Sequence, residues 1–255
     1  MKRVPSRVLL ITGSSGIAAA AATLAARRGD AVFLIGKYAP ECESLTSDLK
    51  GSAFFVGEVT DEDAVKNARQ SCLSRFGRID AVFNVAGMSG RSLGDGPLHE
   101  CSNTAWHTLM DTHAAGTFYV CREVIQYWMA RKHPGVILNT SSVLARNPER
   151  RFFATHAYAA SKGAVESMTL AAACYYAPHK IRLNVLAPGL VRTPMSARAT
   201  KDPAILEFMK QKQPLKAGLT EPHEIARIAC FLLSEDSFPM TGEIVRADAG
   251  WAVTG

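Results

Sequence analysis

Three residues in the second half of the chain have the types and spacing of an acid–base group. Tyr158 and Lys162 are four residues apart in the segment YAASK, so a helix would place both side chains on one face. A phenol has a pKa near ~10, and moving it to neutrality takes about 4 kcal/mol, roughly what one unit charge supplies at ~4 Å. Lys162 is placed to be that charge. Ser142, which ends the preceding apolar run, is placed to polarise a carbonyl beside Tyr158.

The same spacing occurs once more, in YYAPHK, where Tyr176 precedes Lys180 by four residues. Pro178 disrupts the helix at that point, and the segment leads directly into the next apolar run. We therefore interpret the second pair as a chance match and the first as the catalytic candidate.

A glycine-rich loop near the start of the chain is a candidate phosphate-binding site. The segment TGSSGIA, residues 12–18, follows an apolar run and leads into a helical pattern. Glycine lets the backbone approach a pyrophosphate, and a helix N-terminus offers free N–H groups. The same letters also fit a plain turn, so the loop alone leaves both interpretations open. The predicted contacts are Gly13, Ser14, Ser15, Gly16 and Ile17.

The end of the second apolar run bears on the choice of cofactor. An acidic residue there would bind the adenosine ribose of NAD, but the sequence reads Ile35, Gly36, Lys37. With no carboxylate to repel a 2′-phosphate and a cation one residue later, NADP is favoured over NAD. NAD remains possible if Lys37 is only a solvated surface lysine.

Short apolar runs rich in β-branched residues alternate with longer helical patterns along the whole chain. The runs are apolar throughout, as expected for parallel strands buried on both faces. We expect an α/β fold, a Rossmann-type doubly wound parallel sheet of about seven strands with helices on both faces, in one domain over residues 1–255. The predicted strands are 7–12, 31–36, 53–57, 79–86, 135–141, 181–187 and 243–248, and the predicted helices are 17–28, 61–76, 104–131, 156–176 and 221–233.

Three irregular segments, 88–102, 144–156 and 192–220, each follow a predicted strand. Ligands of open α/β sheets bind outside the carboxyl ends of the strands, so these segments are candidate pocket walls and 192–220 is a candidate substrate-binding loop or lid. The expected apolar wall residues are Met88, Leu93, Leu144, Phe152, Phe153, Met195, Phe208 and Met209.

Composition excludes several classes of function. The net charge of +6 comes from Lys and Arg residues scattered along the chain, which argues against nucleic acid as a partner. No apolar segment approaches the ~20 residues that span a bilayer, and the short run after Lys2 and Arg3 does not fit a secretory signal. Six separated cysteines, without metal-site spacing, indicate reduced thiols in a cytoplasmic protein and no metal.

Six segments in order resemble the short-chain dehydrogenase/reductase family over almost the whole chain. They are TGSSGIA at 12–18, NVAG at 84–87, SS at 141–142, YAASK at 158–162, LAPGLVRTPM at 186–195 and TGEIVRADAG at 241–250. The resemblance implies that Tyr158 exchanges a proton with the substrate oxygen while hydride moves to or from nicotinamide. Ser142 would hold that oxygen, and Lys162 would lower the pKa of Tyr158 and bind the nicotinamide ribose. It also places Asn84, Ala86 and Gly87 along the adenosine, and Pro188, Gly189, Val191 and Thr193 around the nicotinamide.

The chain departs from the family pattern at several positions. His113, in HAAG, stands where the family has an asparagine that helps hold a relay water; it fits either a pH-sensitive relay or a core histidine. Glu58 and Val59 replace the usual Asp-hydrophobic pair near the adenine. The interval from Ser142 to Tyr158 is longer than usual, so 147–153 contains an expected insertion at the pocket mouth.

Smaller departures concern the arginines of that loop and the glycine positions. Arg146, Arg150 and Arg151 fit either attraction of an anionic substrate or a solvated loop. The glycine loop reads G-x-x-G, with a small Ala18 kept where the helix must pack closely, and Ala249 replaces a family glycine near the C-terminus.

The sequence therefore predicts an oxidoreductase that transfers hydride between NADP(H) and a carbonyl or secondary alcohol. An NAD-linked dehydrogenase and a catalytically weak cofactor-binding scaffold or sensor are the alternatives. The resemblance adds the expectation of a homo-oligomer, a tetramer or a dimer, built on the helices at 104–131 and 156–178. The substrate itself is a small molecule that the sequence does not identify.

Overall fold

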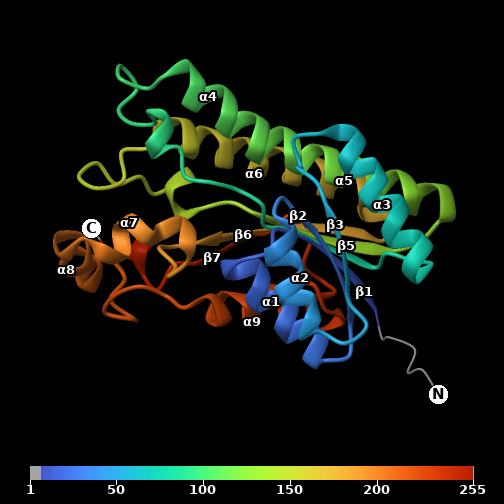
Figure 1. Ribbon diagram of the computed structural model, residues 1–255. Coiled ribbons are helices and arrows are strands. Elements are labelled where there is room, and N and C mark those ends of the chain that lie inside the picture. Colours follow the sequence, from blue (N-terminus) through green and yellow to red (C-terminus); the bar gives the residue numbers. More distant parts are fainter. Residues whose placement is uncertain (1–6, 255) are drawn as a thin grey trace.

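Seven parallel strands form one sheet in the computed structural model, which describes residues 7–254 (Figure 1). Positions 1–6 and 255 of the predicted domain, Lys2 and Arg3 among them, lie outside the described residues. The strand order is β3-β2-β1-β4-β5-β6-β7. Strands β1 to β3 therefore run from the inside of the sheet to one edge, and β4 to β7 run from beside β1 to the other edge. The strands are β1 (Val8–Thr12), β2 (Ala31–Gly36), β3 (Ala53–Val56), β4 (Ala81–Asn84), β5 (Gly135–Thr140), β6 (Ile181–Pro188) and β7 (Ile244–Ala247). The predicted Rossmann-type fold is confirmed.

Helices cover both faces of this sheet (Figure 1). One layer contains α3, α5 and α6, and the other contains α1 and α9. The helices are α1 (Gly16–Arg27), α2 (Ala39–Ser47), α3 (Glu62–Phe76), α4 (Asn103–Leu109), α5 (Gly116–Arg131), α6 (His156–Tyr176), α7 (Ala197–Lys201), α8 (Pro203–Lys212) and α9 (Pro222–Leu232).

Alternate side chains of each central strand enter the two cores, which explains the uninterrupted apolar runs. Along β1, Val8 and Leu10 pack against the α3, α5 and α6 layer, whereas Leu9 and Ile11 pack against the α1 and α9 layer. Because both faces are covered, no position in such a strand tolerates a polar side chain without a partner.

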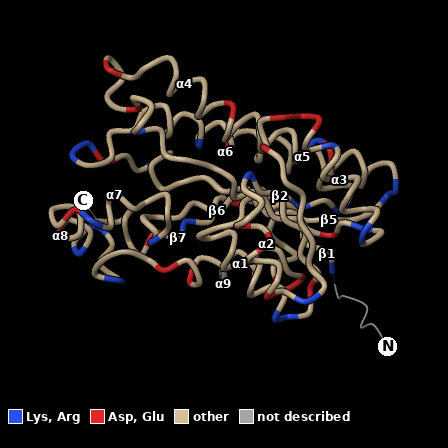
Figure 2. The backbone as a smooth tube through the Cα atoms, viewed as in Figure 1, with Lys and Arg blue, Asp and Glu red and all other residues tan. Residues whose placement is uncertain are grey.

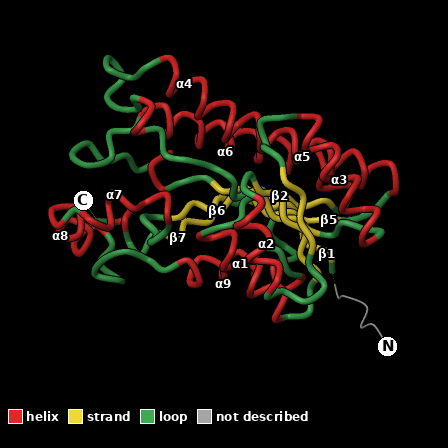
Figure 3. The backbone as a smooth tube through the Cα atoms, viewed as in Figure 1, coloured by secondary structure: helices red, strands yellow, loops and turns green. Residues whose placement is uncertain are grey.

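The predicted helices differ from the observed ones in three places (Figure 3), the first being α2, which was not predicted. The expected helix at 104–131 is divided into α4 and α5 by a π-helical turn at Met110–Ala115, which contains His113. The segment 192–220 is not irregular throughout, because part of it folds into α7 and α8. Its role as a substrate-binding loop or lid stays a prediction. Pro203 starts α8 and the Asp202 carboxylate caps it, so this helix carries a start signal that is readable in the sequence.

Charged side chains are dispersed over the fold. Figure 2 shows Lys and Arg interleaved with Asp and Glu along the backbone rather than gathered on one element. No helix within residues 7–254 is long and apolar enough to cross a membrane. In the same residues, no group of three or more His, Cys, Asp or Glu side chains is arranged to hold a metal ion.

Candidate active site

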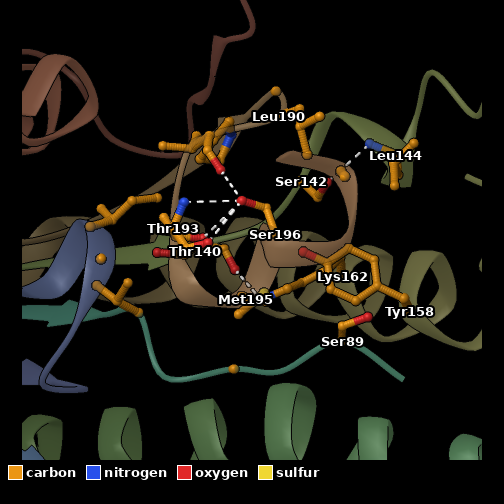
Figure 4. Close-up of a pocket in the computed structure, with 18 of the residues that line it drawn as sticks. Ser89, Thr140, Ser142, Leu144, Tyr158, Lys162, Leu190, Thr193, Met195 and Ser196 are labelled. Carbon is orange, nitrogen blue, oxygen red and sulfur yellow. Dashed lines mark hydrogen bonds between the residues drawn. The ribbon is translucent and has the colours of Figure 1, made fainter. Parts of the chain in front are cut away.

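A cavity lies at the carboxyl ends of β1, β4, β5 and β6, where the strand order reverses. Figure 4 shows Ser142, Tyr158 and Lys162 gathered in it, with Thr193, Met195 and Ser196 beside them. The structure brings together most of the sequence-predicted site residues as lining of this one cavity. They are Gly13, Ser14, Ser15, Gly16, Ile17, Ala86, Gly87, Ser142, Tyr158, Lys162, Pro188, Gly189, Val191 and Thr193.

The acid–base group has the predicted geometry. Tyr158 and Lys162 lie one turn apart on α6, and the Lys162 Nζ is 5.8 Å from the centroid of the Tyr158 ring. The Ser142 hydroxyl, which follows β5, lies near enough to the Tyr158 phenol to act on its pKa, and it accepts from the Leu144 N–H at 3.2 Å. By contrast, Tyr176 ends α6 and Lys180 precedes β6, at the opposite edge of the sheet. The second Tyr-Lys pair is therefore away from the cavity.

The pKa values of this group are not those expected from the sequence. Burial raises the pKa of Tyr158, and the Ser142 hydroxyl opposes that shift only in part. Burial also lowers the pKa of Lys162 to about 7, while its Nζ donates to the Thr140 carbonyl at 2.9 Å. The pKa of Tyr158 is therefore raised rather than lowered, because desolvation is the largest influence on the phenol. That a charged Lys162 favours the ionised phenol stays a prediction.

His113 is a buried, neutral side chain behind the catalytic group. Its Nε2 accepts from the Met88 N–H at 3.0 Å, which leaves the ring proton on Nδ1, 2.8 Å from the Ser161 hydroxyl. Ser161 in turn donates to the Tyr158 carbonyl. Burial and the nearby Lys162 charge hold the pKa of His113 well below its usual value.

This geometry favours the core-histidine interpretation. A ring that stays neutral and uses both nitrogens in fixed hydrogen bonds does not make a pH-sensitive relay. The His113 side chain nevertheless lies next to Tyr158 and Gly87. The ring meets the Tyr158 ring edge-on at 5.3 Å between centroids, and a Cβ added at Gly87 would come within 2.9 Å of Nε2.

Asp95 is a positioning residue that was not predicted from the sequence. Thr155, which precedes α6, makes no capping hydrogen bond with its side chain. The buried Asp95 carboxylate caps this helix instead, accepting from the Ala157 N–H at 3.0 Å and the Tyr158 N–H at 3.2 Å. Because the partners are 62 and 63 positions apart, no local sequence signal predicts the contact.

Replacing Asp95 by Ala is expected to lower the free energy of unfolding by about 1–2 kcal/mol, the usual effect of losing an N-cap. We also expect kcat/KM to fall about tenfold, since the backbone of Tyr158 loses its anchor. Urea unfolding and steady-state turnover measure the two effects. Asp61→Ala is the matched control, because Asp61 caps α3 in the same way without lining the cavity. Equal turnover in both variants would contradict the positioning role.

The glycine loop has the shape of a phosphate cradle. Gly13 and Gly16 both adopt positive φ angles, 104° and 55°, and α1 begins at Gly16 with its first N–H groups beside the cavity. A Cβ at Gly16 would lie 3.0 Å from the Thr193 side chain, so only glycine fits there without displacing Thr193. Ala18 is buried against Gly13, as the G-x-x-G spacing predicts.

The cavity therefore fits a dinucleotide. Its polar donors are the N–H groups at the start of α1 and the hydroxyls of Ser14 and Ser15. The buried hydroxyl of Thr140, on the cavity wall, has no hydrogen-bond partner within the described residues. Such an orphaned group is explained by a polar ligand beside it.

Five predicted site residues do not line the cavity. His113 is one of them. The Asn84 amide points into the core, where it donates to Asn139 at 2.9 Å, and Val59 packs against Gly116. Lys37 and Glu58 form an ion pair at 3.0 Å on the surface, with both side chains about half exposed. Asn84 and Val59 therefore contact the core, Lys37 and Glu58 remain accessible, and the place of all four along the cofactor stays a prediction.

The insertion at 147–153 lies at the pocket mouth, where only Phe153 of this loop lines the cavity. The Glu149 carboxylate accepts backbone N–H groups from residues 151–153, which orders the loop. Arg146 pairs with Glu166 at 2.6 Å. None of the three arginines singled out in the sequence lines the cavity; Arg91 and Arg198 do, and neither was predicted from the sequence.

The apolar walls are also only partly as predicted. Leu144, Phe153 and Met195 line the cavity, together with Trp251, which was not anticipated. Phe152, Phe208 and Met209 belong instead to an apolar cluster that joins the insertion to α8. Met88 and Leu93 do not line the cavity either.

The curated relatives that this chain resembles are dehydrogenases and reductases. A family model described as enoyl-(acyl carrier protein) reductase matches residues 11–252. The A-factor type gamma-butyrolactone 1'-reductase (1S-forming) of Streptomyces virginiae is 35% identical over 97% of this chain and 96% of its own length. Cis-4-hydroxycyclohexanecarboxylate dehydrogenase of Sinomonas cyclohexanicum is 32% identical over 96% of each. The crystal structure of 3-ketoacyl-(acyl-carrier-protein) reductase from Brucella melitensis complexed with NADH gives a TM-score of 0.86 at 25% identity, covering 98% of this chain and 100% of that one.

Proposed function

The chain belongs to the short-chain dehydrogenase/reductase family, and on that premise we propose that it transfers a hydride between NADP(H) and a carbonyl or secondary alcohol substrate. The observation that carries the proposal is the single cavity that holds Ser142, Tyr158 and Lys162 together with the glycine loop. A nicotinamide cofactor, when bound, supplies or accepts the hydride.

The side chains then divide the remaining chemistry. Tyr158 donates its phenolic proton to the substrate oxygen as that oxygen gains charge, and Ser142 holds the same oxygen by a hydrogen bond. The raised pKa of Tyr158 keeps the phenol protonated at neutral pH, which suits reduction. In its charged form Lys162 lowers the Tyr158 pKa and binds the nicotinamide ribose. With a pKa of about 7, it changes charge near neutrality.

A panel of carbonyls and alcohols, assayed by nicotinamide absorbance with both cofactors, tests the function. We expect reduction of at least one ketone class with NADPH. A protein that binds NADPH but turns over no member of the panel would support the alternative of a cofactor-binding scaffold. The intact Ser142, Tyr158 and Lys162 set favours the enzyme.

The preference for NADP rests on the end of β2. Lys37 follows Gly36 there, and no carboxylate occupies either position. Glu58 holds the Lys37 ammonium in this structure and raises the pKa of Lys37 by its hydrogen bond and charge. Because the pair is exposed, a 2′-phosphate can compete with Glu58 for the lysine. An NAD-linked reaction is the alternative, and the Brucella melitensis relative was crystallised with NADH.

Replacing Lys37 by Ala is expected to raise the KM for NADPH about tenfold and to change the KM for NADH less than about twofold, since only NADPH carries the 2′-phosphate. Steady-state kinetics with both cofactors measures this. Lys50→Ala removes the same charge from the exposed turn that precedes β3 and serves as the control. A wild-type enzyme that uses NADH much better than NADPH would contradict the preference.

The assembly and location remain predictions. Large apolar side chains of α4, α5 and α6 are exposed in the single chain, which supports an oligomer built on these helices; they are Trp106, Phe118, Leu170 and Tyr175. All six cysteines are free thiols, in keeping with a cytoplasmic protein.

A further inference from the structure

Two guanidinium groups converge at the mouth of the cavity. Arg91 comes from the loop after β4 and Arg198 from α7, and both line the cavity that holds Tyr158. The Nη2 atoms of both arginines donate to one backbone oxygen, the Phe152 carbonyl, at 2.5 and 3.3 Å. Two positive charges therefore share a single neutral acceptor.

Neither charge is neutralised by an ion pair. Among residues 7–254, no carboxylate lies within salt-bridge distance of Arg91 or Arg198, whereas Arg192 on the same segment pairs with Glu221 at 2.9 Å. Burial lowers the pKa of Arg91, and repulsion from the positive charge of Arg198 lowers it further. The two like charges lie together without a neighbouring anion among the described residues, although Arg91 is partly buried; Arg198 is exposed.

The carboxylates that attract Arg91 are already engaged. Asp95 and Glu149 are the two that act favourably on Arg91. Asp95 caps α6 through two backbone N–H groups, and Glu149 binds the backbone of the insertion. Both are fixed by backbone contacts, and neither forms an ion pair with the two arginines that line the cavity.

We propose that Arg91 and Arg198 bind a carboxylate of the substrate, so that the enzyme acts on oxo- or hydroxy-carboxylic acids. This inference rests on the proposed function, because it places the carbonyl at Ser142 and Tyr158 and the acid group at the arginines. A carboxylate offers two oxygens and a charge, and each guanidinium binds such an oxygen more strongly than a shared neutral carbonyl. Leu144, Phe153 and Met195 line the same cavity and suit an apolar body of the substrate.

The competing explanation is a structural latch, in which the arginines only tie α7 and the loop after β4 to the insertion. The two explanations differ in what they predict for ligands. A latch affects charged and neutral ligands alike, whereas a carboxylate site discriminates between an acid and its amide.

The test is binding of cyclohexanecarboxylate and cyclohexanecarboxamide, measured by ligand-observed NMR titration with and without NADPH. Neither probe is reduced, so the result is independent of turnover. We expect wild-type protein to bind the carboxylate at least about tenfold more tightly than the amide, and Arg91→Gln and Arg198→Gln each to abolish that preference. Arg150→Gln, an exposed arginine of the same mouth that does not line the cavity, should keep it.

Equal binding of the two probes to wild-type protein, or binding of neither, would overturn the inference. So would a carboxylate preference that survives in both variants while their stability falls, since that result describes a latch. Reduction of cyclohexanone is assayed in parallel. A preference for the carboxylate probe without reduction of any ketone would support the carboxylate site and reject the proposed function. Ketone reduction without a preference for the carboxylate probe would reject only the carboxylate site.

Discussion

Replacing Tyr158 by Phe is expected to lower kcat/KM for carbonyl reduction by about a thousandfold, the order of magnitude for loss of a positioned acid. The variant removes one oxygen and keeps the ring. The ring packs edge-on against His113 at 5.3 Å between centroids, and the backbone of residue 158 stays capped by Asp95. The fold and the cofactor cradle should therefore be retained. The measurement is NADPH oxidation with the best ketone of the panel, together with NADPH binding by fluorescence titration.

Tyr176→Phe is the matched control for this prediction. Tyr176 is four residues before Lys180, the same relation as in the catalytic pair, but it lies at the far end of α6. Its replacement should leave kcat/KM within about twofold of wild type. If Tyr158→Phe retains turnover while binding NADPH normally, the catalytic assignment fails.

Lys162→Met is expected to change how stability depends on pH. In the folded protein, burial lowers the pKa of Lys162 to about 7, from 10.5 for a solvated lysine. Between these two pH values the unfolded chain holds a proton that the folded protein has lost, so raising the pH favours the folded state. The contribution of Lys162 to the free energy of unfolding should therefore rise by about 1.4 kcal/mol per pH unit above pH 7 and be least favourable below it.

The measurement is urea unfolding of wild-type protein and Lys162→Met at pH 7, 8 and 9. The difference between the two free energies isolates Lys162 from the buried cysteines and Tyr158, whose pKa values are raised. Lys180→Met, which removes a lysine at an exposed position, is the matched control. If the difference in free energy of unfolding between wild type and Lys162→Met does not change with pH, the buried lysine stays charged and the prediction is wrong.

The local features of the fold followed from the sequence because short-range patterns encode them. Each strand buried on both faces has to be apolar throughout, and that requirement is visible in a run such as AVFLIG at 31–36. The relation of Tyr158 to Lys162 is likewise local, since helical spacing alone places both side chains on one face.

The incorrect predictions concern contacts between segments that are distant in the chain. The sequence showed a histidine at 113 but not that Met88 and Ser161 occupy both of its ring nitrogens. It placed Lys162 beside Tyr158, but not the burial that raises the pKa of Tyr158 and lowers that of Lys162 to about 7. Desolvation depends on every surrounding element, and no single segment encodes it.

Residue types and local spacing were enough to specify the α/β class, the strand positions, the glycine loop and the Ser142, Tyr158 and Lys162 set. Those features depend on residues within one element or at its end. Three contacts became known only from the folded chain: Asp95 caps α6, the Asn84 amide donates to Asn139, and Arg91 and Arg198 donate to one carbonyl, that of Phe152. Each of these contacts joins segments that only the packing of the sheet and its helices brings together, and an isolated charge or amide in the sequence does not name its partner.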